Sequence, residues 1–187
     1  MPDLPALFRR NADAFGARVD AVPDGGWSSP TPCSEWDARA LLNHVVNEQL
    51  WAPDLMAGKT IAEVGDAYDG DLLGDDPKAA WHRAVPGSIE AFSQPLDRTV
   101  HLSYADAPAE EYLTQMITDV AVHGWDLAKA SGGDTTIDPE TATFLLGVWT
   151  ELEDMVRGSG IFGDRVVVPD DASDAAKLLA LLGRNPT

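Results

Sequence analysis

The stretch PAEEYLTQMITDVAVHGWDLAKA, residues 108–130, decides the fold. Apolar residues recur in it every three or four positions, which is the period of an amphipathic α-helix. A proline and two glutamates stand at its start, where they favour helix initiation, and SGGD follows its end, where glycine stops a helix. The sequence therefore predicts a long helix with one apolar face.

Further segments on both sides of this stretch share the helical period or end in helix stop signals. They comprise Leu4–Val22, a segment that begins at Ser34 and continues to about Trp51, Pro77–Phe92, Asp138 to about Val156, and Asp174–Leu182. Between the second and third lies a polar, Gly- and Pro-containing connection over residues 57–77, and only residues 98–104 and 165–171 read as short strands. We expect an all-α protein, an antiparallel four-helix bundle with additional short helices and at most one or two short strands, in a single domain over residues 1–187.

The composition excludes several classes of function. Thirteen Lys and Arg stand against 31 Asp and Glu, so the formal net charge is −18. A surface this acidic repels nucleic acids and anionic membranes. Cys33 is the single cysteine, the N-terminus lacks the apolar segment of a signal peptide, and no apolar run is long enough to span a membrane. We expect a cytoplasmic protein that binds neither nucleic acid nor membrane.

The sharpest chemical signal is DVAVHGWD within the central stretch. Asp119 and His123 stand four residues apart, so they project from one face of the helix, one turn from each other. That face also carries Met116 and Val120, and neither a carboxylate nor an imidazole is stable among apolar side chains without a partner. A shared metal ion would satisfy both, although the same spacing also suits a local charge pair.

A catalytic zinc-type site takes three protein ligands and leaves one position open. His44 is the best third candidate because it lies in the middle of the second predicted helix, the segment expected to pack against the central one. The residues thus predict a metal site of His44, Asp119 and His123. Glu48 could instead be a ligand or the partner of His44, and Asp126 could orient the ring of His123 or simply lie on the helix surface.

The remaining candidates carry less information. His82 and His101 are interpreted as surface or structural residues, and Cys33 as a packed or loop thiol rather than a nucleophile. Trp51, Trp81 and Trp125 are candidates for the wall of a pocket, although tryptophan usually fills core. The sequence contains none of the common nucleotide-binding, HExxH, GxSxG or CxxC motifs.

Two blocks of the sequence, PTPCSEWDARALLNHVV and DVAVHGWDLAKASG, resemble the actinobacterial branch of the DinB-like superfamily, as does the ending FGDRVVVPDDASDAAKLLALLGRNP. This branch holds the metal-binding domain of mycothiol-dependent maleylpyruvate isomerase and the mycothiol S-transferases. The resemblance implies a four-helix bundle whose His, carboxylate, His metal site falls on His44, Asp119 and His123. In one departure, Asp119 stands where the isomerase has Glu, and the isomerase's separate C-terminal domain has no counterpart in this sequence.

The resemblance implies a function as well. We expect a divalent metal, zinc or else nickel or another ion, and mycothiol as the thiol cofactor of a transferase or isomerase that acts on a small electrophile. Its partners would then be a small-molecule electrophile and a low-molecular-weight thiol. Two alternatives stay open: a metal-dependent hydrolase that activates water, and a non-catalytic metal-binding helical protein that forms a homodimer through an apolar helix face.

Overall fold

The computed structural model describes residues 2–154, 157 and 162–186. The chain divides into two compact units, residues 1–135 and 136–187, and each is described by itself. The single domain expected over residues 1–187 stays a prediction. No helix within the described part of the chain is long and apolar enough to cross a membrane.

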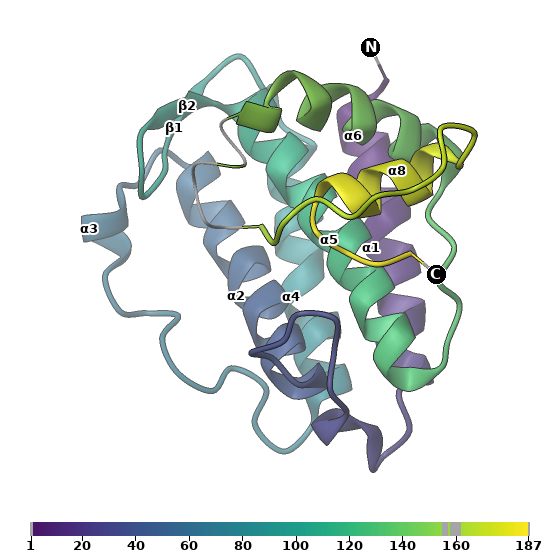
Figure 1. Ribbon diagram of the computed structural model, residues 1–187. Helices are drawn as coiled ribbons and strands as arrows, with labels where there is room; N and C mark the ends of the chain where they lie inside the picture. Colours follow the sequence, from purple (N-terminus) through teal and green to yellow (C-terminus); the bar gives the residue numbers. More distant parts are fainter. Residues whose placement is uncertain (1, 155–156, 158–161, 187) are drawn as a thin grey trace. The chain divides into compact units, whose positions relative to one another are not determined.

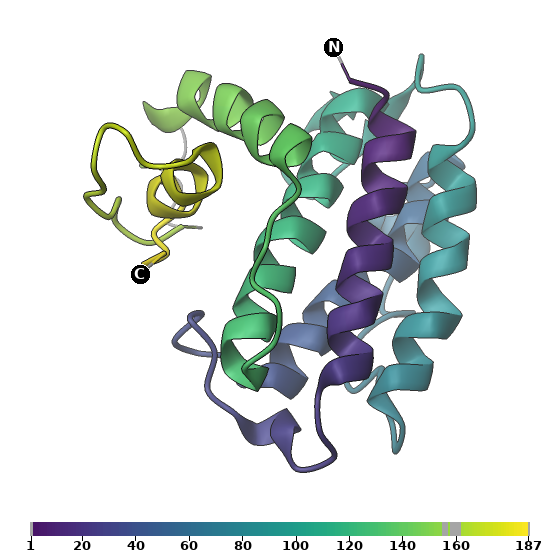
Figure 2. The same cartoon turned by 90° about the vertical axis from the view of Figure 1, so that its right-hand side faces the viewer.

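Four long helices form the first unit: α1 (Leu4–Ala21), α2 (Ala38–Met56), α4 (Pro77–Phe92) and α5 (Ala109–Ser131). Each helix packs against two others, because α1 contacts α4 and α5, and α2 contacts the same two. Figures 1 and 2 show α1 and α5 running in one direction and α2 and α4 in the other. The predicted all-helical bundle is therefore confirmed, and α2 and α5 lie side by side in it.

The ends of these helices follow from local hydrogen bonds. The carboxylates of Asp37 and Asp76 accept the backbone N–H groups of Ala40 and Ala79, at 2.8 and 3.0 Å, and so cap the first turns of α2 and α4. The predicted start of the second helix at Ser34 is wrong, because Asp37 makes this bond and Ser34 does not. At the other end of α5, Gly132 adopts a left-handed conformation with φ 72° and ends the helix.

The interior of the bundle is filled by side chains from all four helices. Phe8 of α1 meets Phe92 of α4 with ring centroids 5.2 Å apart, and Phe15 meets Trp81 at 4.5 Å. Trp81 is only 1% exposed. Gly16 permits this approach of α1 to α4, because a Cβ atom there would stand 2.9 Å from the indole nitrogen of Trp81.

The polar connection over residues 57–77 contains one short helix, α3 (Ile61–Val64), closed by a capping box between Thr60 and Glu63. The part that follows, residues 66–76, we call the strap. One face of α2 fastens it: Asn47 donates to the carbonyl of Tyr68 at 2.6 Å, Asn43 to that of Gly70 at 3.0 Å, and Arg39 to that of Gly74 at 2.8 Å. These three α2 residues are spaced by four, so they lie along one side of the helix.

Short strands were predicted over residues 98–104 and 165–171, and only the first of these segments contains one. β1 (Thr99–His101) lies within residues 98–104, as expected, and pairs antiparallel with β2 (Asp106–Pro108), which leads directly into α5. The strand expected over residues 165–171 is wrong. Among the residues that the structure describes, no strand pairs with this segment; instead, the N–H of Val166 donates to the carbonyl of Ala180 in α8 at 2.9 Å.

The second unit contains α6 (Pro139–Glu151) and α8 (Asp174–Leu181). These helices contact each other, and Trp149 of α6 packs edge-on against Phe162 with centroids 5.4 Å apart. Asp138 and Ser173 cap the two helices through their side chains. Helix α6 starts where the sequence predicts and ends at Glu151, and the predicted end near Val156 lies outside the described residues.

Candidate metal centre

Helices α2 and α5 bring the three predicted ligands together. Nε2 of His44 lies 3.1 Å from Oδ1 of Asp119, and Nε2 of His123 lies 3.3 Å from the same oxygen. One donor atom from each residue lies within 4.8 Å of the other two, a spacing that a single metal ion can bridge. Two imidazoles and one carboxylate are ligands that zinc and other divalent transition metals accept.

The site is buried on one side and open on the other. The side chain of His44 is 30% exposed, that of Asp119 18% and that of His123 11%. The side chain of His44 therefore faces solvent more than the other two.

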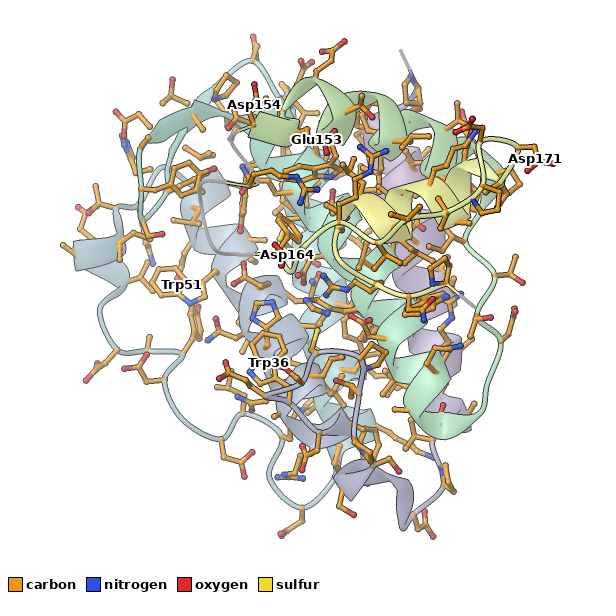
Figure 3. All side chains as sticks on the ribbon, viewed as in Figure 1. Trp36, Trp51, Glu153, Asp154, Asp164 and Asp171 are labelled. Carbon is orange, nitrogen blue, oxygen red and sulfur yellow. The ribbon has the colours of Figure 1, made fainter. Side chains whose placement is uncertain are left out.

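Trp36 covers both imidazoles. Its ring centroid lies 4.7 Å from that of His44 and 5.6 Å from that of His123, while the two imidazoles meet edge-on at 5.2 Å. In Figure 3 the labelled Trp36 lies against α2. The sequence pattern placed Trp36 inside the second helix, whereas it precedes the helix and forms part of the site. The PTPC-x-x-W block was the signal that could have indicated this.

The loop before α2, which holds Trp36, also holds Cys33, and Cys33 lies on the Nδ1 side of His123. Sγ of Cys33 donates to Oδ2 of Asp126 at 3.3 Å, and Nδ1 of His123 lies 3.0 Å from that oxygen. Thr31 braces the loop, because its hydroxyl donates to the carbonyl of Trp36 at 2.7 Å and accepts the N–H of Cys33 at 3.1 Å. Asp126 is fully buried, so it does not lie on the helix surface.

Charges inside the bundle act on one another across the site. Burial lowers the pKa of His44, but the hydrogen bond to Asp119 and the charges of Asp119 and Glu48 outweigh burial and raise it. Burial and the nearby Asp119 carboxylate raise the pKa of Glu48 to about 7, against the opposing effect of the two histidines. Tyr112 lies deeper, and burial with the charges of Glu48 and Asp119 raises the pKa of its hydroxyl.

The raised pKa of Glu48 predicts a pH dependence of stability in protein kept free of metal by a chelator. Folded Glu48 holds a proton up to about pH 7, whereas the unfolded side chain loses it near 4.5. The folded state thus binds more protons in this window, so the free energy of unfolding falls as pH rises through it. Replacing Glu48 by Gln removes this loss and should stabilise the protein at pH 8 by up to about 3 kcal/mol.

Urea denaturation at pH 4.5 and pH 8 measures the difference between the two proteins. At pH 4.5 the glutamate of the folded protein is already neutral, so the two free energies of unfolding should nearly coincide and serve as the internal control. A Glu48→Gln variant that is no more stable than the parent at pH 8 would contradict the prediction.

The other histidines stay apart from this site. His82 pairs with Asp20 at 2.9 Å and His101 with Asp106 at 2.7 Å, both in exposed positions. This agrees with their interpretation as surface or structural residues.

The tryptophans proposed for the pocket wall lie elsewhere. Trp81 is core, and Trp51 packs against Tyr68 with centroids 5.7 Å apart. Trp125 is 3% exposed and has the amine of Lys129 over its ring. For Trp125 the prediction was wrong because this residue follows His123 by two positions and therefore points to another side of α5.

A cleft of about 610 Å³ opens beside His44, between α2 and the strap. Its lining is mixed, with aromatic side chains, amides and charged groups from both walls. The residues that line it include Trp36, Arg39, Asn43, His44, Asn47, Tyr68 and Asp71. This volume is typical of sites that bind small molecules.

Comparison with known proteins gives a family match and a fold. The family model described as Mycothiol maleylpyruvate isomerase N-terminal domain matches residues 8–128. Two uncharacterized proteins from two strains of Mycobacterium tuberculosis are each 33% identical over 184 residues, which is 94% of this chain and 94% of theirs.

Two crystal structures share the fold. The mycothiol-dependent maleylpyruvate isomerase superposes with a TM-score of 0.65 at 15% identity, covering 83% of this chain and 73% of the isomerase. A histidine-to-alanine mutant of a mycothiol-dependent maleylpyruvate isomerase gives 0.67 at 16% identity, covering 92% and 78%. At such identities these two likenesses concern the fold.

Proposed function

The chain belongs to the family of mycothiol maleylpyruvate isomerase N-terminal domains, and from this premise we propose that it is a metal-dependent enzyme that uses mycothiol. The metal is a divalent ion, zinc in the first place, held by His44, Asp119 and His123. The reaction is the transfer of the thiol to a small electrophile, or a thiol-assisted isomerisation of one. The observation that carries this proposal is the meeting of the three donor atoms within 4.8 Å beside an open cleft.

The donor set fits a catalytic ion better than a structural one. Three protein ligands leave a coordination position for an exogenous ligand, whereas structural zinc sites are closed by four. His44 lines the cleft, so that position has a route to solvent. Asp119 is shorter than glutamate by one methylene, which would hold the ion close to α5.

When bound, the ion supplies the positive charge that lowers the pKa of a thiol at its open position. The side chains around the site have the other roles. His44, Asp119 and His123 would hold the ion, and the ring of Trp36 packs against both imidazoles. Glu48, whose charge acts on His44 and Asp119, is the nearby carboxyl that would accept the thiol proton.

The buried hydroxyl of Tyr112 adds a polar group to the interior near the site. Within the described residues this hydroxyl has no hydrogen-bond partner, and the charges of Glu48 and Asp119 act on it. A buried hydroxyl without a partner costs free energy, so a polar ligand or water that reaches this depth would be stabilised.

A screen of small electrophiles with and without mycothiol tests the proposal. We expect turnover that requires both the thiol and a divalent metal, and that is lost when a chelator removes the metal. Turnover that is equal without the thiol would reject the mechanism and favour a metal-dependent hydrolase. Freshly purified protein without any bound metal would favour the non-catalytic helical protein.

A further inference from the structure

His123 presents each ring nitrogen to a different carboxylate. Nε2 lies 3.3 Å from Asp119, on the side of the proposed ion, and Nδ1 lies 3.0 Å from Asp126, on the opposite side. A neutral imidazole has one N–H and one lone pair, and an ionised carboxylate can only accept a hydrogen bond. A proton on Nδ1 would bond to Asp126, the nearer of the two carboxylates, and would leave the lone pair on Nε2, where a metal ligand needs it.

Helix α5 holds Asp126 in position for the contact with Nδ1 of His123. It stands three residues after His123 on α5, it is 0% exposed, and Oδ2 is the oxygen that faces Nδ1. A buried carboxylate persists only where hydrogen-bond donors surround it. The helix therefore fixes both members of the pair at a spacing that leaves little freedom for the ring.

Cys33 supplies a second donor to the same oxygen. Its S–H points at Oδ2 of Asp126 over 3.3 Å, and Thr31 holds the backbone of Cys33 in place. In this contact the thiol is the hydrogen-bond donor and the carboxylate the acceptor. The thiol, the carboxylate and the imidazole thus form a chain that leads from the loop to the metal centre.

We propose that Asp126 is a positioning residue for the metal centre, and that Cys33 holds Asp126 in position. The inference rests on the proposed function, because it assigns these residues a role toward the same ion. Second carboxylates that accept the free N–H of a ligating histidine strengthen metal binding about 10- to 100-fold. Cys33 and Asp126 would then not touch the ion.

The same atoms allow a competing arrangement. Cys33, His123 and Asp126 also place one donor atom each within 4.8 Å of the others, so they could hold an ion themselves. Their ion would use Nδ1 of His123 and a thiolate. A sulfur ligand changes the absorption of bound cobalt, which separates the two arrangements.

The experiment compares full-length proteins for their affinity for Zn²⁺, measured by competition with a chromophoric chelator. Asp126→Asn should weaken binding about 10- to 100-fold, and Cys33→Ser, which keeps a hydroxyl donor, should weaken it less than Cys33→Ala. Asp20→Asn is the matched control, because Asp20 contacts a histidine outside the site, and its affinity should equal that of the parent. Thermal midpoints are recorded without metal, so that a loss of folding is not mistaken for a loss of affinity.

Three results would overturn the inference. One is an Asp126→Asn variant that binds Zn²⁺ as tightly as the parent while His44→Ala does not, which would leave the proposed function intact. Another is a lower thermal midpoint of Asp126→Asn with unchanged affinity, which would make the residue merely structural. The third is a thiolate-to-cobalt charge-transfer band in the Co²⁺-loaded parent that disappears in Cys33→Ser. Absence of Zn²⁺ binding by the parent would instead overturn the proposed function.

Discussion

Replacing His123 by Ala should remove metal binding and thiol-dependent turnover together. His123 is the least exposed of the three proposed ligands, and its Nε2 shares Oδ1 of Asp119 with His44. Without it only two donors remain, which are too few for a catalytic site. We expect the affinity for Zn²⁺ to fall by more than about 100-fold, beyond the effect of a residue that only orients a ligand. Elemental analysis of the purified variant measures the loss directly.

His82→Ala is the matched control for this experiment. His82 also pairs with an aspartate, Asp20, but it lies in an exposed position in the second turn of α4. Its removal should leave both metal content and turnover unchanged. If the His123→Ala variant kept one equivalent of metal, the ligands would have to be sought elsewhere, and the proposed centre would be wrong.

Replacing Trp81 by Ala should produce the largest loss of stability in the first unit. The indole is 1% exposed and packs against Phe15 at the place where Gly16 lets α1 approach α4. Removing a buried aromatic side chain costs its transfer free energy and leaves a cavity, together about 3–5 kcal/mol. That loss is a large part of the total stability of an ordinary domain. Urea denaturation in the presence of a chelator measures it.

Trp51→Ala provides the comparison for Trp81→Ala. Trp51 is half-buried and contacts Tyr68 of the strap, so its removal opens no cavity in the core. We expect a smaller decrease in the free energy of unfolding. Equal losses in the two variants would contradict the placement of Trp81 in the centre of the bundle.

The helices could be predicted from the sequence because their signals are local. Asp76 before Pro77, Asp138 before Pro139 and the glycines after Ser131 each fix one helix end within a few residues. The start of α2 was misplaced because Ser34 and Asp37 are both good N-caps, and only the bond to Ala40 decides between them. The strand expected over residues 165–171 failed for lack of a partner, which no local pattern reveals.

The site was predictable in part for the same reason. Asp119 and His123 are neighbours on one helix, and His44 lies in the middle of the helix expected to pack against it, so the sequence alone named all three and the family resemblance pointed to the same residues. Trp36 and Cys33 could not be predicted as parts of the site, because their contacts with His123 and Asp126 join a loop to a helix about 90 residues away in the chain. Whether the three chosen residues bind a metal stays a prediction.

The strap is fastened to α2 largely through its own backbone carbonyls, at Tyr68, Gly70 and Gly74. Every amino acid has a carbonyl, so side chains along this wall of the cleft can change during evolution while the path of the wall is kept. Gly70 and Gly74 are exceptions, because their φ angles of 87° and 57° suit glycine. Asp71 is a further exception, because its carboxylate pairs with Arg39 and accepts the N–H of Leu73. Under the proposed function, relatives with the same three ligand residues would diverge in the electrophiles they accept by substitution at an intervening position such as 69.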